Sequence, residues 1–179
     1  MRICLLGKNL TNLVLANVLA NKKLYLDIYY NNSLISQKNR SSRTLALSYK
    51  NHDFLKENSK NFNLLSWPTK SIKIYVEKKK LEELFEFKNN NQKNFYLLKY
   101  SALYNLMKKN KFLKFIKLKN YSLDNIKKRN YDLIINSEQK NPITKKYFQK
   151  KIEKNYKSLA HTATIDHKKI ENKTATQIF

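Results

Sequence analysis

The sequence predicts an α/β protein in which a parallel βαβ unit is followed by a block of alternating strands and then by further buried strands. Three observations carry this prediction: an apolar run that ends at a glycine near the N-terminus, strict alternation over 71–77, and a second apolar run over 131–135. A single uniform layer does not produce this order of elements. We therefore expect one domain that the chain leaves, to build a separate sheet, and later rejoins.

The first thirty residues predict the βαβ unit. Ile3 to Leu6 is a short apolar run that ends at Gly7, as is typical of a buried strand in a parallel sheet. Apolar residues then recur at helical spacing from Leu10 to Leu19, and Leu24 to Tyr30 is rich in residues that favour strands. The polar segment 31–42 predicts a loop.

The later elements follow from the same two periodicities. Thr44 to Ser48 is a short apolar patch, and Ser48 is a candidate N-cap for a helix that ends near Lys56. Over 71–77, apolar and polar residues alternate, which predicts a half-buried strand. Further strands are predicted at 84–87, 95–98, 112–118 and 131–135, and two antiparallel strands at 159–165 and 175–179. A helix capped by Ser101 is predicted to end at Lys109, with Leu103, Leu106 and Met107 on its apolar face. A short helix is predicted at 144–149.

The formal net charge of +24 is the most unusual property of the composition. Such a charge normally indicates nucleic acid or an anionic membrane as a partner. The excess comes from 33 Lys against only 4 Arg, beside 24 Asn and one Gly. Lys and Asn are spelled by A/T-rich codons, whereas a dedicated nucleic-acid binder favours Arg for bidentate contacts. We attribute much of the charge to codon bias and expect no specific nucleic acid, with a basic nucleic-acid-binding protein as one alternative.

Other classes of site are weakly represented. The single cysteine, Cys4, excludes an intrachain disulfide and is expected to be a buried core thiol. His52, His161 and His167 are scattered, so no metal site is predicted. No apolar run approaches the roughly 18 residues that cross a bilayer, and no signal-peptide pattern is present. We therefore expect cytoplasmic residence.

The segment Gly7-Lys8-Asn9-Leu10-Thr11-Asn12 is a candidate dinucleotide-binding turn. Such a turn uses three glycines: for the turn itself, for approach of the pyrophosphate, and for helix–strand packing. Gly7 fills the first position, while Asn9 and Asn12 occupy the second and third. Tyr30 ends the second strand, where a carboxylate usually binds the ribose, and Asp27 comes three residues too early on the opposite face. An ordinary βα turn without a ligand is the alternative interpretation.

Beyond this turn, the chain resembles a known family. At Ser41-Ser42-Arg43-Thr44-Leu45-Ala46-Leu47-Ser48 it resembles the flavin-dependent aromatic-ring hydroxylases, most closely those of ubiquinone biosynthesis. Arg43 matches the arginine of the family pattern, and Ser42 replaces the acid before it. The resemblance continues through LLSWPTKSIKIYVEKK at 64–79 and NFYLLKYSALYNLM at 94–107, where Ser101 stands in place of an arginine.

The C-terminal half extends the resemblance. Residues 131–139, YDLIINSEQ, are similar to the family's DLxVGADG element, whose aspartate lies near the FAD pyrophosphate and ribose. Asp132 matches, Glu138 conservatively replaces the aspartate, and Lys145 stands where an arginine closes the motif. Residues 156–179 are similar to a strand pair that ends in NxTAxxRF. The similarity is therefore collinear over essentially the whole chain.

The resemblance implies an incomplete Rossmann-like FAD-binding domain of residues 1–65 and 99–150, with an inserted, partial β-sheet substrate domain of 66–98 and 151–179. It implies FAD as cofactor, NAD(P)H as reductant, and an aromatic, polyprenylated small-molecule substrate. It also implies peripheral association with the inner membrane face and contact with other ubiquinone-biosynthesis proteins. Because these hydroxylases are longer than this chain, the sequence predicts the N-terminal portion of such a monooxygenase, inactive as this stretch alone.

The resemblance marks six positions where the cofactor would be contacted, and no catalytic residue. They are Gly7, Asn9, Asn12, Tyr30, Arg43 and Glu138. Glycines are missing from both flavin elements, which favours a second hypothesis: a non-catalytic descendant of the fold that acts as an interaction protein. Stoichiometric FAD in the purified protein is expected under the first hypothesis, and a stable colourless protein under the second.

Overall fold

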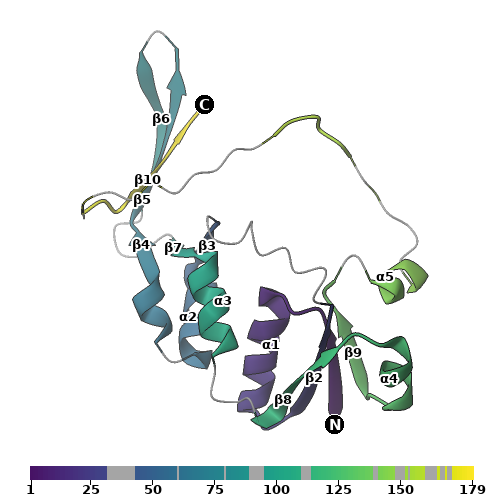
Figure 1. The fold of residues 1–179 in the computed structure, drawn as a ribbon. Coiled ribbons are helices and arrows are strands. Elements are labelled where there is room, and N and C mark those ends of the chain that lie inside the picture. Colours follow the sequence, from purple (N-terminus) through teal and green to yellow (C-terminus); the bar gives the residue numbers. More distant parts are fainter. Residues whose placement is uncertain are drawn as a thin grey trace. The chain divides into compact units, whose positions relative to one another are not determined.

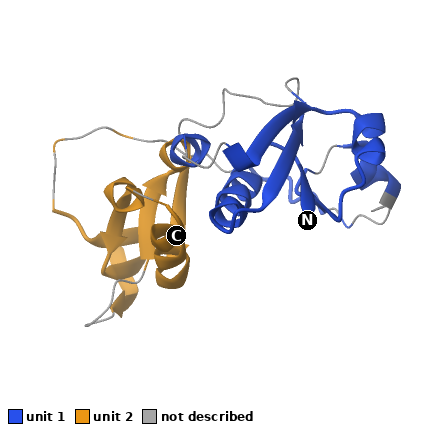
Figure 2. Ribbon diagram, turned by 90° about the horizontal axis from the view of Figure 1, so that it is seen from below, with its two compact units in different colours: residues 1–39, 104–162 blue, residues 40–103, 163–179 orange. Residues whose placement is uncertain are grey.

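A computed structural model of the chain describes residues 1–31, 43–59, 61–78, 80–88, 95–109, 114–138, 141–147, 152, 154–159, 165, 168 and 171–179. The chain divides into two units (Figure 2), unit 1 of Met1–Asn39 and Tyr104–Thr162 and unit 2 of Arg40–Leu103 and Ala163–Phe179. The sequence predicts that 1–65 and 99–150 bind the cofactor and that 66–98 and 151–179 belong to the substrate domain. These functional assignments stay predictions.

Unit 1 is built on a four-stranded parallel sheet (Figure 1). Its strands are β1 (Arg2–Leu6), β2 (Tyr25–Tyr30), β8 (Ile116–Asn120) and β9 (Leu133–Asn136), in the order β8-β2-β1-β9. Numbered by their succession within this sheet, the strands follow the order 3-2-1-4 of the Rossmann fold. In such a sheet a ligand binds at the carboxyl ends of the strands where the order reverses, here between β1 and β9.

Both faces of this sheet are covered, as expected for parallel strands. Helix α1 (Leu10–Asn21) connects β1 to β2, and α4 (Leu123–Lys128) connects β8 to β9. On one face Cys4, Leu6 and Tyr29 pack with Ile126 of α4. The alternate residues of the strands, which point to the other face, are also buried: Ile3, Leu5, Leu26 and Ile28. Burial raises the pKa of the Cys4 thiol to about 12, so the prediction of a buried core thiol is confirmed.

Unit 2 contains an antiparallel sheet in the order β3-β7-β4, made of β3 (Thr44–Ser48), β7 (Phe95–Lys99) and β4 (Ser66–Thr69). Helix α2 (Tyr49–Asn58) begins after Ser48, whose hydroxyl accepts a hydrogen bond from the Asn51 N–H at 3.4 Å, so the predicted N-cap is confirmed. A 3₁₀-helix at Phe62–Leu65 precedes β4. The buried His52 ring stacks on Tyr96 with ring centroids 3.5 Å apart.

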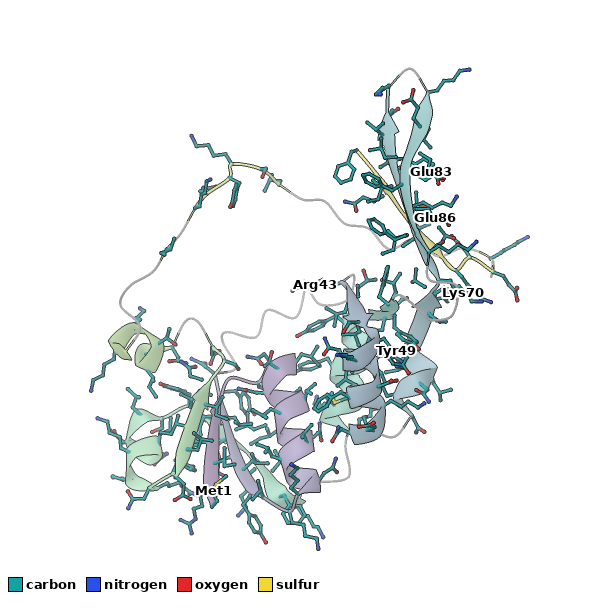
Figure 3. All side chains as sticks on the ribbon, turned by 180° about the vertical axis from the view of Figure 1, so that it is seen from behind. Met1, Arg43, Tyr49, Lys70, Glu83 and Glu86 are labelled. Atoms are coloured by element: carbon teal, nitrogen blue, oxygen red, sulfur yellow. The ribbon has the colours of Figure 1, made fainter. Side chains whose placement is uncertain are left out.

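A second sheet of unit 2 has the order β10-β5-β6, with β5 (Ser71–Glu77), β6 (Leu81–Lys88) and β10 (Thr174–Ile178). The β5–β6 hairpin is antiparallel and carries a bulge between Ile74 and Tyr75. Glu83 of this hairpin (Figure 3) accepts hydrogen bonds from Lys73 at 2.9 Å and from Tyr75 at 3.0 Å. Both contacts are exposed, so Glu83 belongs to a solvated face of the hairpin.

Two further sequence predictions concern the pairing of the C-terminal strand and the cap of the helix after β7. The C-terminal strand β10 pairs in parallel with β5, and the predicted antiparallel pairing with 159–165 falls mostly on residues outside the described ranges. Of the segment 159–165 only Leu159 and Ile165 are described, and neither lies in a strand. Ser101 lies inside helix α3 (Tyr100–Lys108), which begins directly after β7, so it is not the N-cap.

Three boundaries differ from the prediction for physical reasons. β8 begins at Ile116, where pairing with Leu26 of β2 begins, and 110–113 lie outside the described residues. β9 begins at Leu133 because the register with β1 starts there. Helix α5 (Pro142–Tyr147) begins earlier than predicted, since Asn141 accepts a hydrogen bond from the Thr144 N–H at 2.8 Å and Pro suits the first helical position.

The predicted loop over 31–42 lies outside the described residues except for Asn31. None of the helices in the described ranges has both the length and the apolar character needed to cross a membrane.

Candidate functional site

The turn after β1 lies at the carboxyl edge of the parallel sheet, where the strand order reverses. Gly7 has a φ of 103°, a backbone conformation that favours glycine. Its N–H donates to the Tyr29 carbonyl at 2.8 Å, which ties the turn to β2. A Cβ placed on Gly7 would lie 3.0 Å from the Glu138 Cβ and 3.1 Å from the Asn9 Nδ2. The turn therefore requires glycine at this position.

Asn9 joins the two strand ends on either side of the reversal. Its Oδ1 accepts a hydrogen bond from the Asn12 N–H at 3.1 Å, which makes Asn9 the N-cap of α1. Its Nδ2 donates to the Ser137 carbonyl at 3.1 Å and to the Ser137 hydroxyl at 2.8 Å, just beyond β9. At a dinucleotide site the pyrophosphate takes the position in front of such a helix N-terminus. The Asn9 side chain crosses that position.

Asn12 fills the space that a third glycine would leave between helix and strand. The side chain is fully buried, and its Nδ2 donates to the carbonyls of Leu6 and Gly7, both at 2.8 Å. Its Oδ1 is buried and has no hydrogen-bond partner among the described residues. The Asn12 side chain thus connects α1 to the end of β1 and stabilises the turn between them.

Glu138 lies over the glycine turn. Its N–H donates to Asn136 Oδ1 at 3.0 Å, and its carbonyl accepts from Asn141 Nδ2 at 3.1 Å and from the Thr144 hydroxyl at 2.7 Å. Burial raises the pKa of the Glu138 carboxyl, which favours its neutral form. The contacts of Asn136, Asn141 and Thr144 with Glu138 were not predicted from the sequence, although the Asn-Pro pair at 141–142 indicates a helix start.

The two other predicted positions have different surroundings. Tyr30 ends β2, and the Lys8 ammonium lies 4.5 Å from the centroid of its ring. Burial, with the positive charge of Lys108, lowers the pKa of Lys8. Arg43 belongs to unit 2, where its guanidinium lies 5.7 Å from the Tyr100 ring centroid. The structure thus brings Gly7, Asn9, Asn12 and Glu138 together in unit 1, with Tyr30 at the end of the neighbouring strand, while the cofactor role of all six positions stays a prediction.

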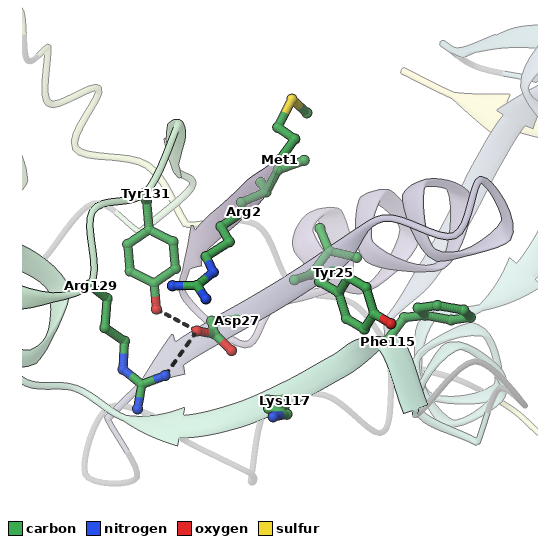
Figure 4. Close-up of a pocket in the computed structure, with 10 residues that line it drawn as sticks. Met1, Arg2, Tyr25, Asp27, Phe115, Lys117, Arg129 and Tyr131 are labelled. Atoms are coloured by element: carbon green, nitrogen blue, oxygen red, sulfur yellow. Dashed lines mark hydrogen bonds and ion pairs between the residues drawn. The ribbon is translucent and has the colours of Figure 1, made fainter.

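Asp27 lies away from the carboxyl edge of the sheet and makes no contact with the glycine turn among the described residues. Its carboxylate accepts hydrogen bonds from the Lys119 ammonium and from the Tyr131 hydroxyl, the latter at 2.5 Å, and lies 3.8 Å from the Arg129 guanidinium (Figure 4). Burial alone would raise the pKa of Asp27, but these hydrogen bonds and positive charges hold it below its ordinary value. Asp27 is therefore an ionised, fully engaged group on the α4 face.

The residues of the turn can be compared with what an FAD pyrophosphate requires. The glycine conformation, the helix N-terminus and the place in the sheet fit such a group. The side chains of Asn9 and Glu138 lie across its path, but both are only partly buried, and Asn9 is held there by side-chain hydrogen bonds. The backbone thus fits the pyrophosphate, provided that the Asn9 side chain releases Ser137.

No cluster of three or more metal-ligating side chains occurs in the parts of the chain that the structure describes. His161 and His167 lie outside those parts.

The sheet order and the glycine turn define the class of fold, a Rossmann-type parallel α/β unit in a chain that also forms antiparallel sheets. Solved structures with this fold include a protein assigned as an FAD-containing monooxygenase from Photorhabdus luminescens subsp. laumondii TTO1, with a TM-score of 0.58 and 14% identity over 83% of this chain and 42% of that one. P. aeruginosa PqsL in complex with 2-aminobenzoylacetate gives a TM-score of 0.53 and 10% identity over 67% of this chain and 33% of that one. For 2-methyl-3-hydroxypyridine-5-carboxylic acid oxygenase the TM-score is 0.52 and the identity 10%, over 66% of this chain and 31% of that one.

At these low identities the structural similarity shows a shared fold alone. The chain spans 42% or less of the length of these three structures. No protein-family model matches the sequence, and no curated protein matches it.

Proposed function

We propose that this chain is the N-terminal, FAD-binding portion of a flavin-dependent monooxygenase that hydroxylates an aromatic ring. One observation carries the proposal: the positive-φ turn at Gly7 and the N-terminus of α1 lie where the order of a 3-2-1-4 parallel sheet reverses. Solved structures of FAD-containing and aromatic-ring oxygenases share this fold, which supports the same class. The resemblance of residues 41–48 and 131–139 adds ubiquinone biosynthesis as the pathway.

The chain's own residues would hold the cofactor in the following way. Gly7 makes the turn, and the first N–H groups of α1 attract the pyrophosphate. Glu138 lies beside this position, and burial raises the pKa of its carboxyl. The resemblance, and no contact between the two units, gives Arg43 the role of supplying positive charge near the flavin or its phosphates. FAD, when bound and reduced by NAD(P)H, supplies the oxygen chemistry, while the protein supplies position and electrostatics.

The finer features of the proposal rest on the resemblance. They are a polyprenylated aromatic substrate, peripheral association with the inner membrane face from the cytoplasm, and contact with other ubiquinone-biosynthesis proteins. We also propose that this stretch alone does not hydroxylate, because the oxygenases that share its fold extend well beyond the part that it matches.

A second candidate is a non-catalytic descendant of the fold that acts as an interaction protein. The observation that favours it is the side chain of Asn9, which occupies the front of α1 and joins it to Ser137. In this case the turn is held closed by the chain itself and no flavin enters.

Titration of the chain with FAD, followed by flavin fluorescence at high salt, separates the two candidates. Because FAD carries a pyrophosphate and riboflavin does not, we expect saturable binding of one FAD that is at least about tenfold tighter than binding of riboflavin. High salt suppresses the non-specific attraction of FAD to a chain of charge +24. Equal affinities, or no saturation, would contradict the flavin proposal and support the descendant.

A further inference from the structure

A second candidate site lies at the opposite edge of the parallel sheet from Gly7. A pocket of about 450 Å³ is lined by the first residues of β1 and β2, by Phe115 and Lys117 at the start of β8, and by residues that precede β9. This volume falls within the roughly 300–1,000 Å³ of small-molecule pockets. All its lining residues belong to unit 1, so the pocket forms within one unit.

Three cationic side chains line this pocket (Figure 4). They are Arg2, Lys117 and Arg129. In the described part of the chain, no hydrogen bond or ion pair engages the Arg2 guanidinium or the Lys117 ammonium, and Arg129 has only its 3.8 Å contact with Asp27. Asp27 does not offset these charges, because Lys119 already pairs with its carboxylate. The pocket therefore carries excess positive charge.

The arginines make this charge more specific than the general basicity of the chain. Only 4 of the 37 basic residues are arginine, and two of them, Arg2 and Arg129, meet here from positions far apart in the sequence. A bias of the composition toward lysine does not explain why two arginines line the same pocket. Guanidinium groups bind phosphate through two parallel hydrogen bonds, so an arginine pair favours a phosphate ligand.

The opposite wall of the pocket is aromatic. The rings of Tyr25 and Phe115 have centroids 5.2 Å apart and are tilted by 60°, and Tyr25 is 61% exposed. An exposed tyrosine ring such as that of Tyr25 stacks on flat heterocycles, including nucleobases. Phe115 is only partly exposed, and the Lys114 ammonium lies 5.1 Å from the centroid of its ring. Cations on one side and aromatic rings on the other therefore match a molecule that carries both a phosphate and a flat ring.

We propose that this pocket binds a nucleoside monophosphate, with the phosphate held by Arg2, Lys117 and Arg129 and the base packed against Tyr25 and Phe115. The site is separate from the glycine turn, since it lies at the amino ends of the strands whose carboxyl ends form that turn. The proposal therefore does not depend on whether the turn binds FAD.

Isothermal titration with AMP, adenosine and inorganic phosphate tests the proposal on the full chain at fixed ionic strength. We expect AMP to bind at one site, more tightly than either adenosine or phosphate alone. Arg129→Gln should weaken AMP binding by about tenfold, because it removes a charge-assisted hydrogen-bond donor. Lys22→Gln is the matched control: it removes one exposed positive charge of the same unit at a residue that does not line the pocket, and should leave the affinity unchanged.

Two further variants locate the binding. Tyr25→Ala should reduce the affinity for AMP and not that for phosphate, while Asn9→Gly at the glycine turn should change neither. Equal losses in Arg129→Gln and Lys22→Gln would show non-specific attraction and overturn the proposal. So would phosphate that binds as tightly as AMP, or AMP affinity that responds to Asn9→Gly.

Discussion

Asn9→Gly is expected to tighten FAD binding by about tenfold. In the wild-type chain the pyrophosphate must displace the Asn9 amide from both its hydrogen bonds to Ser137. Each such bond contributes about 0.5–1.5 kcal/mol net, and a factor of ten in affinity corresponds to about 1.4 kcal/mol. Glycine also releases the Asn12 N–H that Asn9 now caps. Replacement of an Asn cap by glycine costs the helix only a few tenths of a kcal/mol, so the fold should survive.

The fluorescence titration of FAD measures this change. Ser137→Ala serves as a second variant, because it removes one acceptor of the Asn9 amide and keeps Gly7 and Asn9 themselves, at the loss of the 3.3 Å hydrogen bond from the Ser137 hydroxyl to the Leu6 carbonyl. It should tighten FAD binding in the same direction by a smaller factor. If both variants bind FAD as weakly as the wild type, or more weakly, Asn9 is not the obstacle and the proposed phosphate position is wrong.

Asp27→Asn is expected to lower the free energy of unfolding of unit 1 by about 2–4 kcal/mol at pH 7. The carboxylate is 14% exposed and accepts hydrogen bonds from Lys119 and Tyr131, with Arg129 close by. Asparagine keeps the shape but loses the charge. The Lys119 ammonium, itself only 18% exposed, then remains without its counterion.

The effect should depend on pH with a definite sign. The folded pKa of Asp27 lies below its unfolded value of 3.8, so the ionised carboxylate stabilises the fold fully above that value. This stabilisation is lost as pH falls through the folded pKa, and the two proteins should converge in strong acid. Urea unfolding of both proteins from pH 7 downward measures the difference. Asp124→Asn, an exposed charge in the first turn of α4, is the control and should change stability by less than about 0.5 kcal/mol.

The local part of the fold could be predicted because local patterns determine it. The apolar run before Gly7, the helical spacing after it and the strand to Tyr30 predict β1, α1 and β2. Ser48 predicts the start of α2, since a cap contacts the backbone only three residues away. The strictly alternating segment gives β5 with its observed bounds.

Contacts between distant segments could not be predicted in this way. Ser137 lies 128 residues from Asn9, and no spacing rule connects the two. The parallel pairing of β10 with β5 likewise depends on tertiary structure, because the sequence of one strand does not determine which strand it pairs with. The pocket lined by Arg2 and Arg129 could not be predicted for the same reason, because these two residues lie far apart in the sequence.

The flavin content of the protein purified from its own cells, at the length it has there, tests the central claim most directly. Denaturation, extraction and absorbance of the released flavin give the number of FAD molecules per chain. If the turn at Gly7 holds FAD, close to one FAD per chain is expected in the native product. A folded, colourless protein that also takes up no FAD when it is supplied would contradict the account and leave the Gly7 turn as a structural connection only.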